Sequence, residues 1–330
     1  MVRLAYILAA SHSGSTLLSM LLGSHPQIAT VGEMTLCHRA IGDLDQYRCS
    51  CGVLIRECGF WQKVGEGMAA RGSAFDLACA GTDYGGTDYG TVESRYARRL
   101  LGPLHRGRFL EGLRDAALGL SPTWRRQLPQ MHRQNAALAS TVGELTKATV
   151  IIDSSKTGVR LKYLLRNPEL DVKVIHLVRD GRAVALTYVD PARFADAQDP
   201  TKRGGGMGGD REDEKLPMAE AAYEWRRSLE EAQKVLRGLP RSRWIEVRYE
   251  DYCQNPDAAL RRLHRFLGVE PGRQPKEFRA VEQHVVGNGM RLDTTSEIRL
   301  DERWRKELTG QDLRIFHRVA GATNRRHRYE

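Results

Sequence analysis

The stretch LAYILAASHSGSTLLSMLLGSHP, residues 4–26, decides the fold, because an apolar run passes through small polar residues into a second apolar segment. Residues 4–10 are short, apolar and followed by turn residues, which is typical of a buried β-strand. From Thr16 onward the apolar residues have helical spacing and stop at the breakers Gly23 to Pro26, which predicts a helix. A strand, a tight loop and a helix N-terminus together offer backbone N–H groups to a phosphate or sulfate.

This loop differs from the common nucleotide-binding loop. The pattern GxxxxGK[ST] needs a lysine before its last hydroxyl residue, whereas here Ser15 directly follows Gly14. A kinase that uses magnesium and a nucleoside triphosphate is therefore disfavoured. Taken alone, a serine- and glycine-containing loop after an apolar strand also fits a tight turn with no ligand.

The composition indicates a globular protein that binds an anion. The chain has 330 residues, 41% of them hydrophobic, which is enough for one large α/β domain or two smaller ones. The net charge of +10 suits a nucleotide, a sulfated product, nucleic acid or an acidic glycan. We expect no nucleic-acid partner, because the arginines are scattered and no zinc-finger, RNP-type or basic-zipper pattern occurs.

The chain has no apolar stretch near the roughly 20 residues that a membrane helix requires. Residues 4–10 resemble the core of a signal peptide, but a glycine loop and an amphipathic helix follow too closely for a cleaved leader. We therefore expect a cytoplasmic protein without a transmembrane segment. The sequence does not indicate the oligomeric state.

The remainder of the chain alternates between strand-like and helix-like segments. This pattern predicts a parallel sheet with helices on both faces, within a single domain that spans residues 1–330. Residues 37–147 form an insertion that is rich in cysteine, glycine and arginine and contains helical pieces. Residues 200–217 carry five glycines among dense charge, so they predict a flexible loop, either a lid or a passive linker.

Four of the six cysteines lie near one another in the sequence. Cys49, Cys51 and Cys58 fall within the segment CSCGVLIREC, and Cys37 is close enough to join them. They could bind zinc, form disulfides or remain reduced and partly buried. The pattern CxC with a third cysteine seven residues later is not a standard zinc spacing, so the sequence leaves the three alternatives open.

Four motifs follow one another in chain order: SHSGSTLL with HPQIATVGE (11–33), DSSK (153–156), VIHLVRDGRAVALTYV (174–189) and VRYEDYCQNPDAALRRLHRFLGV (247–269). Together they resemble the sulfotransferases that use 3'-phosphoadenosine 5'-phosphosulfate (PAPS), especially the carbohydrate and tyrosylprotein branches. The resemblance covers residues 4–35, 150–190 and 243–305. It implies a P-loop-like parallel β-sheet flanked by helices, PAPS as donor, PAP as product, and no metal requirement for catalysis.

The resemblance implies which residues bind the donor. The first loop of that family wraps the 5'-phosphosulfate, and the matching residues here are His12, Ser13, Gly14, Ser15 and Thr16. His12 departs from the family pattern, which usually has a permanent cation at this position. A neutral imidazole would donate one hydrogen bond with less charge.

Arg179 and Thr187 correspond to the family's pair of residues that hold the 3'-phosphate, and a guanidinium fork with a hydroxyl suits that group. Arg179 could instead form an ion pair with Asp180 or a neighbour. Tyr249 resembles a tyrosine that contacts the nucleotide, although core packing is the alternative. Asn288 and Arg291 lie in a segment similar to the one that closes over PAPS in the carbohydrate branch.

Catalysis of sulfuryl transfer needs a base for the acceptor hydroxyl, an in-line path and positive charge near the departing phosphate. Glu33 matches the catalytic glutamate in the GE motif of the tyrosylprotein branch, and a structural carboxylate is the alternative. Lys156 resembles the lysine of the family's KxP segment and would stabilise the bridging oxygen, with Gly158 where proline is common. His12 is a further catalytic candidate.

We assign no role to His176 or His284. The acceptor that the resemblance favours is a sugar hydroxyl on a glycan or small molecule, because the GN…R and DERW segments lean toward the carbohydrate branch. A tyrosyl side chain or a phenolic metabolite is the alternative acceptor. A small-molecule kinase and a nucleotide-binding module without catalysis are the alternative functions.

Overall fold

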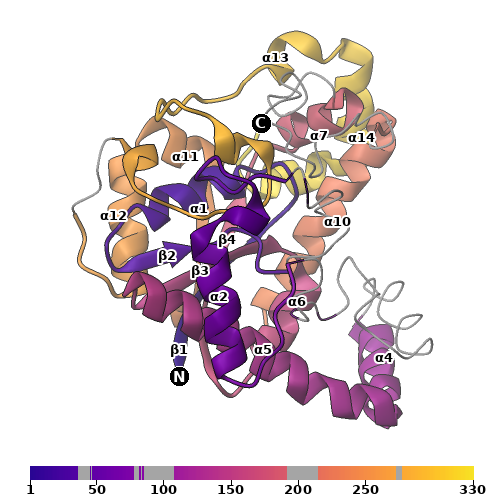
Figure 1. The fold of residues 1–330 in the computed structure, drawn as a ribbon. Helices are drawn as coiled ribbons and strands as arrows, with labels where there is room; N and C mark the ends of the chain where they lie inside the picture. The colour runs from indigo at the N-terminus through magenta and orange to yellow at the C-terminus, as the bar shows by residue number, and fades with distance from the viewer. Residues whose placement is uncertain are drawn as a thin grey trace.

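The computed structural model describes residues 1–35, 45, 47–77, 82, 84, 108–191, 215–272 and 277–330. Its centre is a parallel sheet of five strands in the order β2-β3-β1-β4-β5 (Figure 1). The strands are β1 (Val2–Ala9), β2 (Ile28–Thr30), β3 (Val150–Lys156), β4 (Leu170–Val178) and β5 (Trp244–Arg248). The α/β class and the parallel sheet that the sequence predicts are confirmed.

Helices flank the sheet and account for most of the remaining described residues. The α-helices are α1 (Ser15–Gly23), α2 (Gly59–Ala70), α4 (Arg108–Leu120), α5 (Pro122–Thr146), α6 (Gly158–Leu164), α7 (Gly181–Val189), α10 (Met218–Leu236), α11 (Tyr249–Gln254), α12 (Pro256–Leu267), α13 (Trp304–Glu307) and α14 (Gly310–Arg326). Short 3-10 helices occur at Ile55–Glu57, Arg241–Arg243, Phe278–Ala280 and Gly289–Leu292. No helix in the described part of the chain combines the length and the apolar character that a membrane span requires.

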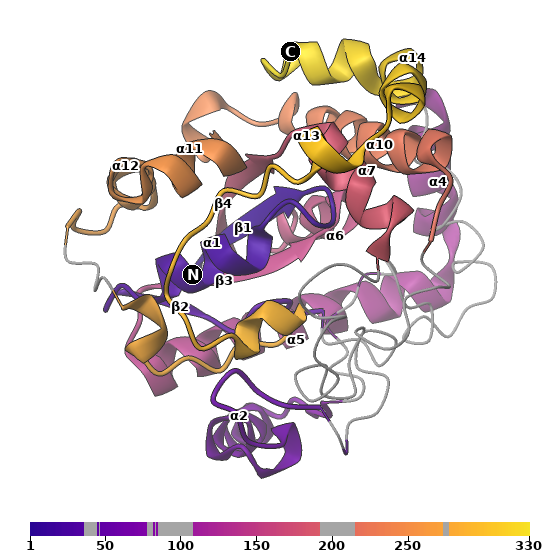
Figure 2. The same ribbon diagram turned by 90° about the horizontal axis from the view of Figure 1, so that it is seen from above.

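β1 lies in the middle of the sheet and is buried on both faces, which explains its continuous apolar run. Because successive side chains of a strand point to opposite faces, Leu4, Tyr6 and Leu8 belong to one core cluster with residues of α5 and α6. Ala5 and Ile7 belong to a second cluster with residues of α1 and α12. A third cluster joins α7, α10, α13 and α14, which lie together in Figure 2.

α5 covers part of the sheet, although it lies within residues 37–147, which the sequence predicts to be an insertion. It packs against β1 and β3, and α2 packs on it from outside (Figure 2). Ser121 caps its N-terminus by accepting a hydrogen bond from the Trp124 N–H, and Pro122 occupies the first turn. Other parts of residues 37–147, and residues 200–214 of the predicted flexible loop, lie outside the described residues.

A buried ion pair between Asp153 and Arg160 connects the carboxyl end of β3 to the neighbouring helices. Asp153 accepts a hydrogen bond from Arg160 Nε at 2.8 Å, and neither side chain is exposed to solvent. The other oxygen of Asp153 accepts from the Ser155 and Met34 N–H groups, at 2.9 and 3.3 Å. Arg160 also donates to Asn135 of α5 at 2.7 Å, so one pair joins β3, α5, α6 and the segment that follows β2.

Removal of the charge at this pair should destabilise the fold. We expect Asp153→Asn to lower the free energy of unfolding by about 3 to 5 kcal/mol, because the Arg160 charge then stays buried without a counter-ion. Glu297→Gln is the matched control, since Glu297 pairs with Arg299 on the surface and should leave stability unchanged. Urea unfolding followed by circular dichroism measures both variants, and equal effects would show that the buried pair is not needed.

Candidate active site

The loop between β1 and α1, residues 10–14, forms an anion-binding shape. Gly14 has a left-handed backbone with φ of 87°, and it turns the chain into α1 at Ser15. No side chain among the described residues caps this helix, and its first turn carries no acidic residue. The Ser13 hydroxyl is buried and has no hydrogen-bond partner among the described residues. The backbone N–H groups at the start of α1 and the Ser13 hydroxyl therefore lie close together. Such a group of hydrogen-bond donors is suited to bind an anion.

Two tyrosines of α11 support this loop from behind. The Tyr252 hydroxyl donates to the Gly14 carbonyl at 2.9 Å. A Cβ atom at Gly14 would overlap the Tyr252 oxygen and the Tyr249 ring, so a larger residue would force one of these side chains to shift. The sequence analysis missed Tyr252, although its spacing of three residues from Tyr249 on a helical turn places both rings on one face.

Arg179 connects the loop to the C-terminal part of the chain. It follows β4, and its guanidinium donates to the His12 carbonyl at 2.8 Å and to the Asp301 carboxylate at 2.9 Å. The guanidinium also lies over the Tyr249 ring, 4.3 Å from its centre. The structure therefore brings together His12, Arg179 and Tyr249, which the sequence assigns to one site.

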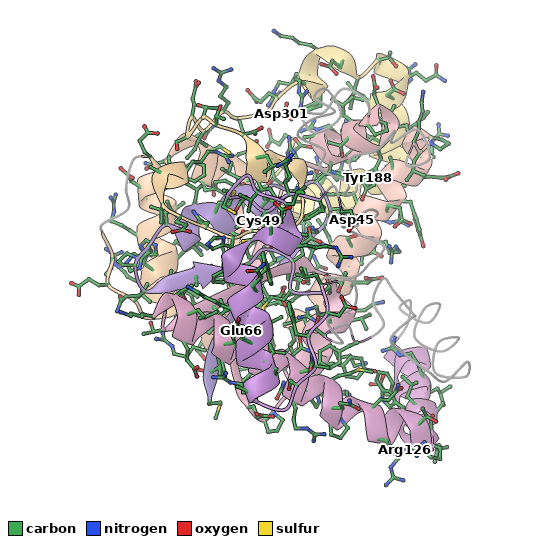
Figure 3. All side chains as sticks on the ribbon, viewed as in Figure 1. Asp45, Cys49, Glu66, Arg126, Tyr188 and Asp301 are labelled. Carbon is green, nitrogen blue, oxygen red and sulfur yellow. The ribbon has the colours of Figure 1, made fainter. Side chains whose placement is uncertain are left out.

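The acid that pairs with Arg179 is Asp301 and not the neighbouring Asp180. Asp180 instead binds Arg182 at 2.7 Å and caps α7. Burial would raise the pKa of Asp301, but the hydrogen bond from Arg303 and the charge of Arg179 lower it to about 2. Asp301 is therefore ionised at neutral pH. Figure 3 shows Asp301 and Tyr188 in the same upper part of the molecule, although they are far apart in the sequence.

Thr187 lies in α7, eight residues after Arg179, and its side chain is buried. Its hydroxyl donates to the Val184 carbonyl of the same helix at 2.6 Å. The next residue, Tyr188, packs edge-on against the His12 ring with 4.9 Å between the ring centres. α7 therefore borders the loop, and the phosphate contact assigned to Thr187 stays a prediction.

Glu33 and Lys156 form an ion pair at the carboxyl edge of the sheet. Glu33 follows β2, Lys156 ends β3, and these strands are neighbours whose carboxyl ends meet. Lys156 has a positive φ of 70°, and both side chains are about one-fifth exposed, at 21% and 18%. A Cβ atom at Gly287 would lie 3.2 Å from the Glu33 carboxylate. The candidate base and cation thus lie side by side, and their catalytic roles stay predictions.

Asn288 and Arg291 lie in the segment that passes this edge. Asn288 accepts a hydrogen bond from the Met290 N–H at 3.1 Å and caps the short helix that follows. Arg291 is buried and donates to the Arg48 carbonyl at 2.8 and 3.0 Å and to the Gly287 carbonyl at 2.8 Å. In this structure Arg291 binds backbone carbonyls, and the donor contacts assigned to both residues stay predictions.

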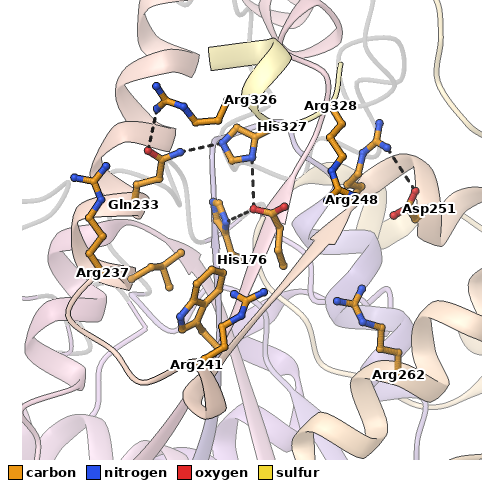
Figure 4. Close-up of a pocket in the computed structure, with 13 residues that line it drawn as sticks. His176, Gln233, Arg237, Arg241, Arg248, Asp251, Arg262, Arg326, His327 and Arg328 are labelled. Carbon is orange, nitrogen blue, oxygen red and sulfur yellow. Dashed lines mark hydrogen bonds and ion pairs between the residues drawn. The ribbon is translucent and has the colours of Figure 1, made fainter. Parts of the chain in front are cut away.

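A separate cavity of about 530 Å³ runs along the edge strand β5 (Figure 4). Glu246 in its wall faces His176 at 3.3 Å and His327 at 3.4 Å, and hydrogen bonds from these rings hold the pKa of Glu246 well below its usual range. None of the residues that we assign a site role line this cavity. It is rich in arginine: Arg237, Arg241, Arg248, Arg262, Arg326 and Arg328.

Comparison with protein families matches residues 104–272, just over half of the chain, to the sulfotransferase family. The chain belongs to the sulfotransferase family. This confirms the resemblance that the motifs indicate, although the matched residues do not include the β1–α1 loop. The matched residues contain β3, β4 and β5 and the helices from α4 to α12.

Two curated relatives of this sulfotransferase-family chain are carbohydrate sulfotransferases. Carbohydrate sulfotransferase 3 of Homo sapiens is 27% identical over 170 residues, which cover 50% of this chain and 35% of that protein. Carbohydrate sulfotransferase 2 of Mus musculus is 27% identical over 181 residues, which cover 47% and 34%. The chain spans about a third of the length of these relatives.

A solved structure supports the fold over nearly the whole chain. The sulfotransferase domain from the Synechococcus PCC 7002 olefin synthase superimposes with a TM-score of 0.50 and 20% sequence identity. The superposition covers 96% of this chain and 94% of that one. The likeness in fold therefore includes β1, α1 and β2, which lie outside the family-matched residues.

Replacement of Gly14 tests how tightly the loop is held. Gly72→Ala is the matched control, since Gly72 also has a positive φ of 68° but has no atom within 4 Å of a Cβ position. We expect Gly72→Ala to cost about 1 to 2 kcal/mol from the backbone alone. Gly14→Ala should cost about 1 to 3 kcal/mol more, because the new methyl group overlaps both tyrosines. Chemical unfolding measures the difference, and equal costs would contradict the close approach of α11.

Proposed function

We propose that the chain transfers a sulfuryl group from PAPS to an acceptor hydroxyl on a carbohydrate. The observation that carries the proposal is the buried Ser13 hydroxyl, which has no hydrogen-bond partner in the described part of the chain. It lies beside the N-terminus of α1, which no described side chain caps, with Arg179 at the same loop. Membership of the sulfotransferase family supports the reaction class. The printed names of the two curated relatives support a carbohydrate acceptor.

In this proposal the loop binds the 5'-phosphosulfate end of the donor. The N–H groups from Ser13 to Thr16 and the Ser13 hydroxyl donate to its oxygens, which would satisfy the buried hydroxyl. Arg179 and Thr187 bind the 3'-phosphate. Arg179 can do so because its Nε is buried without a partner among the described residues, and because Asp301 takes only part of the guanidinium fork.

In this proposal Glu33 acts on the acceptor hydroxyl and Lys156 acts on the departing phosphate oxygen. PAPS supplies the sulfuryl group, whose bond to the 5'-phosphate oxygen breaks as the acceptor oxygen bonds to sulfur. Glu33 takes the proton of the acceptor hydroxyl, and Lys156 places positive charge where the phosphate oxygen gains its electrons. Since the two side chains contact each other, an acceptor that reaches this edge meets the base and the cation together.

The test is transfer of labelled sulfuryl groups from PAPS to three classes of acceptor, with and without added magnesium. Oligosaccharides, a tyrosine-containing peptide and a simple phenol are offered separately, and products are identified by mass spectrometry. We expect label in the oligosaccharides at a rate that magnesium does not change. Label in the peptide or the phenol alone would show that the acceptor is a tyrosyl or phenolic hydroxyl and not a carbohydrate. Phosphate transfer from magnesium ATP without any sulfate transfer would overturn the reaction class.

Arg179→Ala should weaken PAP binding by about 2 to 3 kcal/mol, because a partly buried, charged hydrogen bond to the 3'-phosphate is lost. Isothermal titration calorimetry with PAP measures this. Arg299→Ala is the control, since Arg299 is exposed and forms a surface ion pair with Glu297. Unchanged affinity in the Arg179 variant would remove this residue from the donor site.

Glu33→Gln keeps the shape of the side chain but cannot take a proton at neutral pH. We expect the chemical step to slow by roughly 100-fold or more while PAP affinity stays within about threefold. Single-turnover transfer, PAP titration and a melting curve are measured on one preparation, with the exposed Glu66→Gln on α2 as control. A structural carboxylate would instead lose stability and PAP affinity together, and a near wild-type rate would rule out Glu33 as the base.

A further inference from the structure

Three cysteines and one histidine converge beside the candidate active site. The sulfurs of Cys49, Cys51 and Cys58 and the Nδ1 of His284 all lie within 4.8 Å of one another. Cys51 and Cys58 are 3.7 Å apart at sulfur, and His284 Nδ1 is 3.4 Å from Cys58 and 3.6 Å from Cys49. A tetrahedron with metal–sulfur bonds of about 2.3 Å places its ligand atoms about 3.7 Å apart. The four ligand atoms therefore already have nearly the spacing of a tetrahedral metal site.

The three cysteines lie on a short hairpin and at the start of α2. Residues 48–54 form a hairpin in which the Cys49 N–H donates to the Val53 carbonyl at 3.0 Å and Gly52 turns the chain with a φ of 89°. Cys58 is the N-cap residue of α2, where the helix dipole favours negative charge. Burial raises the pKa of the Cys58 thiol, and the backbone N–H groups of Trp61 and Phe60 partly offset that rise.

His284 is oriented as a metal ligand. Its Nδ1 faces the sulfurs, while its Nε2 lies 3.2 Å from the Glu282 carboxylate. A histidine that binds a metal usually donates its other ring N–H to a carboxylate, which leaves the facing nitrogen as the ligand. The Phe60 ring stacks on the imidazole with 4.4 Å between centres and 6° between planes, so the orientation is fixed by packing as well.

We propose that Cys49, Cys51, Cys58 and His284 bind one Zn²⁺ ion. Thiolates and an imidazole in a tetrahedron are the donor set that zinc prefers. The protein supplies all four ligands, so the site is closed and structural. It is separate from the sulfuryl-transfer reaction, and the proposal does not depend on the donor or the acceptor.

The ion would join two segments that border the candidate catalytic edge. Ser50 and Tyr47 already bond to the chain at residues 283–287, through the Val285 N–H at 2.7 Å and the Gly287 N–H at 2.7 Å. Gly287 lies against the Glu33 carboxylate. A zinc ion that holds His284 to the cysteine hairpin would therefore fix the segment that supports Glu33.

The test is the zinc content of the full chain, grown in zinc-supplemented medium and purified under reducing conditions without a metal-affinity step. Mass spectrometry of the metals should find one zinc per chain. Replacement of zinc by cobalt(II) should give the visible bands of a tetrahedral site and the near-ultraviolet bands of thiolate ligands. Wild-type protein without tightly bound metal, or with a disulfide between Cys51 and Cys58, would overturn the proposal.

Variants identify the ligands. Cys51 is exposed, so Cys51→Ser should leave the core intact and still lower zinc affinity by more than the 10- to 100-fold that is typical of an outer-shell change. Glu282→Gln should lower it by about 10- to 100-fold. Cys253→Ser is the control, because this free cysteine lies on α11 outside the cluster, and it should keep one zinc per chain. Wild-type zinc affinity in Cys51→Ser would contradict the assigned ligand set.

Discussion

The N-terminus of α1 follows the carboxyl end of β1, and no side chain of the described residues caps it, so its backbone N–H groups are available to a ligand. Backbone N–H groups at such a helix end favour an anion, and the loop before it contains the buried Ser13 hydroxyl with no partner among the described residues. α11 packs closely on the loop at Gly14, where a larger side chain would overlap Tyr249 and Tyr252. Arg179 adds positive charge at the same point by binding the His12 carbonyl.

The C-terminal part of the chain completes this edge of the sheet. Val286 pairs with Gly32 as an additional strand-like bridge, and Gly287 then passes beside Glu33. Further along, Asp301 binds Arg179, and the Tyr249 hydroxyl donates to the Arg299 carbonyl at 3.3 Å. The region after residue 277 therefore contacts both the candidate donor loop and the candidate catalytic pair. The proposed zinc ion would bind this region near its start, through His284.

The sequence was informative where structure depends on near neighbours. The β1–α1 unit followed from an apolar run, small residues and helical spacing. Glu33 and Lys156 are 123 positions apart, and only the resemblance to the family assigned them to one site; in the structure they meet because adjacent parallel strands end at one edge. The partners of these residues depend on long-range folding. Asp301 is 122 positions from Arg179, and His284 is 226 positions from Cys58, so no local pattern could pair them.

The most direct test of the account is a crystal structure of the chain with bound PAP. The account predicts the 5'-phosphate within hydrogen-bond distance of the N–H groups from Ser13 to Thr16, and the 3'-phosphate on Arg179. The arginine-rich cavity along β5 offers an alternative place for an anion of this size. PAP bound in that cavity, with the β1–α1 loop making no contact to it, would contradict the central claim.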